Sequence, residues 1–100
     1  MRDLKELNKL EEYCKVNAIP YKRIDKDSTI GIFDIGDRHM IIVYKSEEDK
    51  ENNNRWFDAI CQGGSYGGDE GLLEIYGGIV QNEYDDVEGW LTADEIISRM

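Results

Sequence analysis

An apolar stripe at helical spacing runs along the first part of the chain. Its members recur every three to four residues, with charged side chains between them: Leu4, Leu7, Leu10 and Cys14. Asp3 is a suitable N-cap, and Glu6 three residues later completes the spacing of a capping box. Pro20 ends the pattern because the residue before a proline avoids helical geometry. The pattern therefore predicts an amphipathic helix that ends by about residue 18.

Strand-like alternation follows in the middle of the chain. Residues 21–26 alternate weakly, residues 28–35 form a β-branched run that stops at a Gly-Asp turn, and residues 39–44 (HMIIVY) are the strongest strand. Residues 46–54 (SEEDKENNN) contain no apolar side chain, so we expect an exposed loop, after which residues 56–62 (WFDAICQ) return as a strand. These segments predict an antiparallel meander of three to four strands.

Two short helices are predicted beyond the glycine-rich residues 63–68 (GGSYGG). The first starts at Asp69 as N-cap and stops at Gly77, with an apolar body between them. Residues 81–89 (QNEYDDVEG) then form an acidic loop. The second helix has the clearest start in the chain, a Thr92/Glu95 capping box with a hydrophobic staple from Leu91 to Ile96.

Together these elements predict one α+β domain over residues 1–100. An N-terminal helix precedes the antiparallel β-meander of three to four strands, and two short C-terminal helices pack on the sheet. The sequence has no apolar run long enough to span a membrane and no signal-peptide core, so we expect a cytoplasmic protein. Cys14 and Cys61 lack CxxC spacing, which predicts reduced thiols rather than a disulfide or a zinc site.

Charge divides the chain into two unlike halves. Residues 1–57 hold 12 acids and 11 bases, whereas residues 58–100 hold 10 acids and only Arg99 as a base, a net charge of −9. This excess disfavours direct binding of nucleic acid, which requires Lys and Arg to replace counterions. It suits a basic protein partner, although a solvated acidic face that serves solubility is the competing explanation.

Aromatic side chains lie among these acids, as at many protein interfaces. In the alternative, Tyr76 and Trp90 belong to the core, and hydroxyls such as that of Tyr66 reach water. The expected binding residues come from two acidic stretches: Tyr84, Asp85, Asp86, Glu88, Trp90, Asp69 and Glu70. One specific version is a protein that imitates nucleic acid to block a nuclease or regulator, which requires Asp85, Asp86 and Glu88 on one exposed surface.

Residues 39–44 and 56–62 are expected to pair as a hairpin, and this hairpin places a cysteine near a histidine. If Ile41 and Val43 share a face with the odd-numbered residues of the returning strand, His39 lies opposite or diagonal to Cys61. A thiol beside an imidazole is the minimum for nucleophilic catalysis, but no third residue is assigned to orient His39. We therefore expect that the protein is not an enzyme and has no catalytic residues. The alternative is a small enzyme that uses Cys61 and His39.

The other face of the hairpin is apolar as well. Its members alternate with those of the first face: Met40, Ile42, Tyr44, Trp56 and Ile60. This pattern indicates a sheet covered on both sides, or a side kept for a partner. A structural component that assembles through this second face is a further alternative.

Neither a cofactor nor a metal is predicted. Asp69 and Glu70 at the expected helix start repel a phosphate, and no Lys-Ser or Lys-Thr follows the glycines. Asp85, Asp86 and Glu88 supply oxygen ligands, but their spacing does not fit an EF-hand.

Two strings of the second half resemble a family of short uncharacterised proteins from phages and prophages of Gram-positive bacteria. They are residues 56–78 (WFDAICQGGSYGGDEGLLEIYGG) and residues 86–96 (DVEGWLTADEI). The resemblance carries no mechanism with it. It implies a small accessory protein of a mobile element that acts in the host bacterial cytoplasm.

Overall fold

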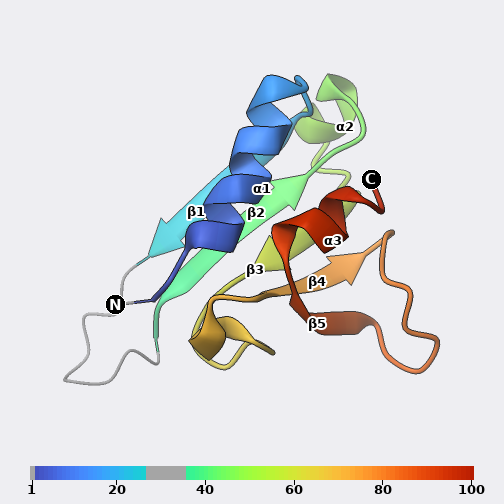
Figure 1. The fold of residues 1–100 in the computed structure, drawn as a ribbon. Helices are drawn as coiled ribbons and strands as arrows, with labels where there is room; N and C mark the ends of the chain where they lie inside the picture. The colour runs from blue at the N-terminus through green and yellow to red at the C-terminus, as the bar shows by residue number, and fades with distance from the viewer. Residues whose placement is uncertain (1, 27–35) are drawn as a thin grey trace.

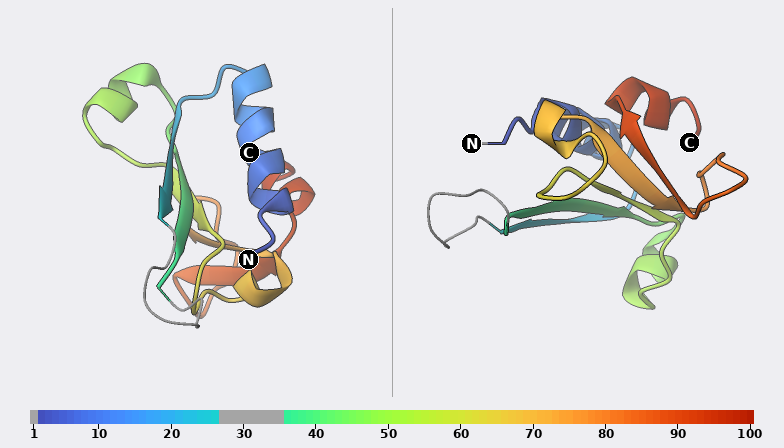
Figure 2. Two further views of the ribbon diagram at one scale, coloured as in Figure 1. Left: turned by 90° about the vertical axis from the view of Figure 1, so that its left-hand side faces the viewer. Right: turned by 90° about the horizontal axis from the view of Figure 1, so that it is seen from below.

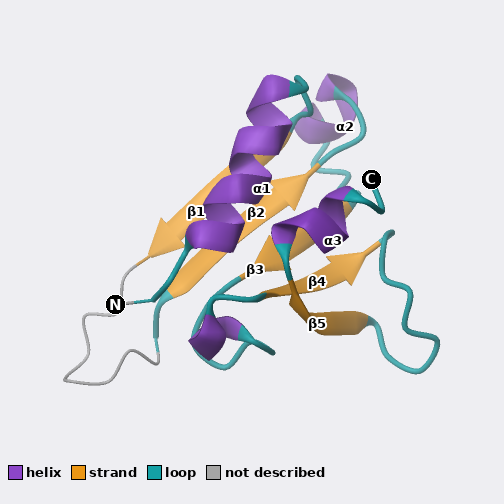
Figure 3. Cartoon of the chain, viewed as in Figure 1, coloured by secondary structure: helices purple, strands orange, loops and turns teal. Residues whose placement is uncertain are grey.

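Five antiparallel strands form one sheet in the part of the chain that the computed structural model describes, residues 2–26 and 36–100 (Figure 1). The strands lie in the order β1-β2-β3-β4-β5, so each pairs with its neighbour in the sequence. Figure 3 distinguishes helices from strands by colour. The elements are α1 (Lys5–Val16), β1 (Tyr21–Lys26), β2 (Arg38–Val43), α2 (Glu47–Glu51), β3 (Phe57–Ile60), the 3-10 turn η1 (Gly68–Glu70), β4 (Leu73–Gly77), β5 (Val87–Leu91) and α3 (Ala93–Ile97).

The α+β class and the N-terminal helix are confirmed, but α1 starts differently from the prediction. Its N-cap is Leu4, which makes no side-chain capping bond, while Asp3 accepts a hydrogen bond from the backbone amide of Lys5. The carboxylate of Glu6 instead accepts the amide of Ala93 at 2.8 Å. Glu6 therefore satisfies an orphan amide of the adjacent helix α3 rather than one of its own helix.

α1 and α3 cover one face of the sheet, whereas α2 lies on the other side (Figure 2). The predicted register is confirmed, because Ile41 pairs with Ala59 and Val43 with Phe57. The core under the two helices consists of side chains from α1, strands β2 to β5 and the turns beside them, and α3: Leu7, Leu10, Cys14, Ile41, Val43, Phe57, Ala59, Cys61, Leu73, Ile75, Ile79, Leu91, Ala93 and Ile96.

The second face of the sheet is only partly covered. Ile42 and Tyr44 are buried, but Ile24 on the edge strand β1 is 46% exposed. Asp58 in the central strand β3 lies between Ile42 and Tyr76 and is itself buried. Burial raises the pKa of the Asp58 carboxyl, and Arg55 opposes this shift from 3.6 Å.

Two predictions for the second half are wrong. Residues 69–77 form η1 and the strand β4 instead of a helix, and part of the expected loop at 81–89 belongs to β5. The meander therefore has more than the predicted three to four strands, and one of the two C-terminal helices is replaced. In β4 the core face takes Leu73 and Ile75 while Glu74 points outward, so the segment has the two-residue period of a strand.

The expected loop at residues 46–54 contains the short helix α2. Ser46 caps it by accepting the amide of Asp49, and its first turn is acidic. A polar sequence can form such a turn because capping and charge, rather than burial, stabilise it. The strand predicted at residues 28–35 lies outside the described residues.

Candidate functional site

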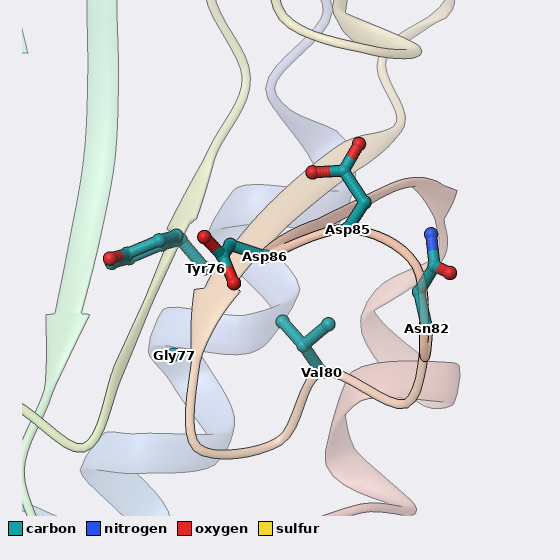
Figure 4. Close-up of a pocket in the computed structure, with 6 residues that line it drawn as sticks. All are labelled: Tyr76, Gly77, Val80, Asn82, Asp85 and Asp86. Carbon is teal, nitrogen blue, oxygen red and sulfur yellow. The ribbon is translucent and has the colours of Figure 1, made fainter.

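The loop between β4 and β5 surrounds a hollow of about 310 Å³ (Figure 4). β4 ends at Gly77, whose φ of 121° favours glycine and lets the chain turn sharply away from the sheet. The hollow is lined by Tyr76, Gly77, Val80, Asn82, Asp85 and Asp86. Asp86 lies beside Tyr76, and Asn82 lies across the hollow from them (Figure 4).

Two carboxylates thus border a hollow that is open to solvent. Asp85 and Asp86 are exposed, as is Glu83 in the same loop. Within residues 2–26 and 36–100, no cation forms a salt bridge with any of these three acids. Tyr84, at the tip, is 95% exposed, and its amide donates to Asn82 Oδ1 at 3.0 Å. We name this group of residues, 82–86, the acidic loop.

Glu88 does not belong to this exposed group. Its Oε2 lies 2.6 Å from Nη2 of Arg99, and its Oε1 accepts from Nη1 of Arg99 at 3.0 Å. The Glu88 side chain is only 22% exposed and the Arg99 side chain only 14%. The Arg99 guanidinium holds the pKa of the Glu88 carboxyl below its usual range. The hypothesis of a nucleic-acid mimic required Glu88 to share an exposed surface with Asp85 and Asp86, and this requirement is not met.

The pairing of Arg99 has a consequence for the whole second half. Arg99 is the only base in residues 58–100, and Glu88 neutralises it. The same guanidinium donates to Ile79 O at 3.3 Å, and Glu88 also accepts the amide of Gln81 at 3.0 Å. The pair therefore fixes both the start of the segment that leads into the acidic loop and the strand that leaves it.

The other predicted binding residues lie near the opposite end of β4. Asp69 and Glu70 belong to η1, and the Asp69 carboxylate, although 93% exposed, accepts from Arg2 at 3.0 Å. Trp90 lies in β5 and is 57% exposed. Tyr76 is 54% exposed, so the alternative that placed Tyr76 and Trp90 in the core is wrong. The structure therefore separates the predicted binding residues into two groups, one beside the start of β4 and one beyond its end.

Cys61 and His39 are opposite each other in the sheet, as the register predicted. The Cys61 amide donates to His39 O at 3.0 Å. Their side chains, however, face different groups. The thiol approaches the carbonyl oxygens of Asp3 and Gly68, whereas Nδ1 of His39 lies 2.8 Å from Asp25.

The environment of Cys61 does not favour a nucleophile. The residue is fully buried, and burial raises the pKa of its thiol, so the reactive thiolate is disfavoured. Cys14 is buried as well, and its pKa is raised to about 11 for the same reason. These cysteines act as small apolar core residues.

A charged network beside His39 escaped the sequence analysis. Asp37 accepts from the guanidinium of Arg2 and from the amide of Gly63, while Nε2 of His39 lies 3.4 Å from Asp37. Arg2 holds the pKa of Asp37 below its usual value. The network joins the N-terminal segment to β2 and the glycine-rich turn. Arg2 and Asp37 are 35 positions apart, so no local pattern indicates their pairing.

Within residues 2–26 and 36–100, no group of three or more His, Cys, Asp or Glu side chains is arranged to hold a metal ion. No helix in the same residues has the length and apolar character needed to cross a membrane. No known protein family, curated protein or solved structure matches the chain.

Proposed function

We propose that the protein is a non-enzymatic binding module whose acidic second half docks onto a basic surface of another protein. The observation that carries this proposal is the charge balance of residues 58–100. Their only base is paired with Glu88, while Asp85 and Asp86 border an open hollow and form no salt bridge with any Lys or Arg of residues 2–26 and 36–100. A complementary surface therefore has to bring its own positive charges.

The acidic loop supplies both charge and an aromatic anchor. A Lys or Arg side chain that enters the hollow meets Asp85, Asp86 and the ring of Tyr76. Exposed ion pairs each contribute only about 0.2–1 kcal/mol, so they affect association rate and selectivity more than affinity. Tyr84 is almost fully exposed, and its aromatic ring can serve as an interface anchor with a larger contact area than the carboxylates of the loop. Binding should accordingly weaken as salt is added.

The family resemblance of the second half supports a setting for this activity. A small accessory protein of a phage or prophage meets its partner in the bacterial cytoplasm, and the partner is a host or phage protein. The cysteine-enzyme alternative has less support because its thiol is buried with a raised pKa. Assembly through the second sheet face stays an alternative, and light scattering tests it.

Capture from a nuclease-treated lysate of a Gram-positive bacterium, with elution by a salt gradient, tests the proposal. The loop variant Glu83→Gln/Asp85→Asn/Asp86→Asn removes three charges from the acidic loop. The matched control Glu47→Gln/Glu48→Gln/Glu51→Gln removes three exposed charges from α2, on the other side of the sheet.

We expect a basic protein to bind the natural chain and the α2 control, to elute at moderate salt, and to be lost by the loop variant. Equal capture by all three proteins contradicts a role for the acidic loop. The absence of any basic protein at low salt contradicts the proposal as a whole.

A further inference from the structure

Trp90 has an unusual backbone for a large side chain. Its φ of 61° lies in the left-handed region, which bulky L-residues rarely adopt because the Cβ approaches the following carbonyl. It follows Gly89 at an irregularity in the β4–β5 pairing, where the register shifts between Leu73 and Ile75. The side chain is 57% exposed, so packing in the core accounts for little of this strain. Strain of this kind is concentrated at binding sites.

A second exposed aromatic residue is fixed beside Trp90. The amide of Trp90 donates to Tyr66 O at 3.2 Å, and a Cβ on Gly89 would lie only 2.2 Å from the Cβ of Tyr66. The amide of Tyr66 in turn donates to Glu74 Oε1 at 3.0 Å, and its side chain is 56% exposed. Glycine at position 89 thus lets the turn lie directly on the strand. We call Tyr66, Gly89 and Trp90 the aromatic platform.

A carboxylate lies at the aromatic platform. Glu74 lies on β4 opposite the irregular part of β5, and its Oε1 accepts a hydrogen bond from the amide of Tyr66 at 3.0 Å. Arg99, the only base of this half, is held by Glu88. Exposed aromatic rings beside a carboxylate attract a cation, and they favour guanidinium over ammonium. A planar guanidinium stacks on a ring while its N–H groups remain free to bond to a carboxylate.

We propose that the aromatic platform binds an arginine side chain of the basic partner. This inference rests on the proposed function, since it identifies the chemistry of the partner that the acidic half binds. It adds a second contact at the far end of β4 from the acidic loop. Lysine and an apolar side chain are the competing occupants.

Oligoarginine and oligolysine of equal length separate these possibilities. Their affinities for the natural chain are measured by calorimetry at low salt. We expect oligoarginine to bind more tightly by a factor on the order of five, as stacking on exposed rings allows. The variant Trp90→Asn should lose this preference, because asparagine tolerates the positive φ but offers no ring. Charge-driven binding of both peptides should persist in this variant.

The indole N–H resonances give a readout that does not depend on a variant. The chain has two tryptophans, and the Trp56 ring already lies under Nζ of Lys45, 5.6 Å from its centroid. We expect oligoarginine to shift the Trp90 resonance and to leave that of Trp56 in place, while oligolysine moves neither.

Each other outcome contradicts a particular claim. Equal affinity for the two peptides, or a preference that survives in Trp90→Asn, overturns the arginine site and leaves the proposed function standing. A Trp90 resonance that oligoarginine leaves unmoved also overturns the arginine site. Failure of both peptides to bind overturns the proposed function itself.

Discussion

The Glu88–Arg99 pair should stabilise the fold and hold the acidic loop in place. Its two hydrogen bonds form a bidentate contact at 2.6 and 3.0 Å, and both side chains are about four-fifths removed from solvent. Arg99→Met keeps much of the side-chain volume but leaves the Glu88 carboxylate without its cation. Glu88→Gln keeps an acceptor for the amide of Gln81 and leaves Arg99 without its anion.

The expected loss lies between two limits. Exposed ion pairs contribute about 0.2–1 kcal/mol, whereas removing one partner of a fully buried pair costs about 3–5 kcal/mol. A bidentate pair with one solvent-facing edge falls between them, so Arg99→Met should lower the free energy of unfolding by about 2 kcal/mol. For a domain of this size the Tm then falls by on the order of 10 °C. Glu88→Gln should cost about 1 kcal/mol.

Urea unfolding followed by circular dichroism measures both single variants and the double variant. Because the side chains are in contact, their effects should not add, and the double-mutant cycle should give a coupling energy of about 1 kcal/mol. A coupling energy below about 0.3 kcal/mol would refute the reasoning. Glu88 would then be free to contact a partner, as the sequence had suggested.

Three further predictions follow from buried or crowded groups. Burial raises the pKa of Asp58 in the folded chain above its unfolded value of 3.8, so stability is lost as pH rises through the folded pKa. Asp58→Asn should therefore raise the urea midpoint near neutral pH but not at low pH, and a lowered midpoint near neutral pH would contradict this. Cys61 should react with a thiol reagent on the order of 100-fold more slowly in the folded chain than in urea, and fast alkylation of the folded protein would revive the enzyme alternative. Gly89→Ala places a methyl group against Tyr66 and should cost about 1–3 kcal/mol in thermal unfolding, whereas an unchanged Tm would mean that the turn yields easily.

Local patterns predicted the elements that depend on neighbouring residues. The apolar stripe of α1 has helical spacing, and the Thr92/Glu95 capping box is present with both of its hydrogen bonds. The alternation of side chains along each strand fixed the β2–β3 register, because a shift by one residue would turn Ile41 and Val43 away from the core.

Long-range contacts decided the elements that local patterns predicted wrongly. The apolar residues of segment 72–76 fit a helix as well as a strand, and pairing with β3 selects the strand. Glu6 has capping-box spacing in its own helix, yet the amide of Ala93, 87 positions away, is the group that it binds. The packing of α1 beside α3, and not the spacing of residues along the sequence, brings the Glu6 carboxylate to the Ala93 amide.

The sequence predicted the exposed carboxylates of the candidate site but not the ion pair that removes Glu88 from them. A loop without a long apolar run indicates exposure, and Asp85 and Asp86 are indeed at the surface. Glu88 lies in the same acidic stretch, but Arg99, which follows α3 in the chain, pairs with it and removes it from the exposed set. The strain at Trp90 has one local signal, the preceding glycine, and that glycine gains its meaning only from the contact with Tyr66.

The most direct test of the central claim is a map of backbone amide chemical shifts as oligoarginine is added at low salt. We expect the shifts to concentrate in residues 66–90, including Asp85 and Asp86, and to disappear when salt is raised. The acidic helix α2 serves as an internal comparison, since its carboxylates are exposed on the other side of the sheet. Shifts centred on α2, or spread evenly over all exposed acids, would contradict a binding surface on the second half.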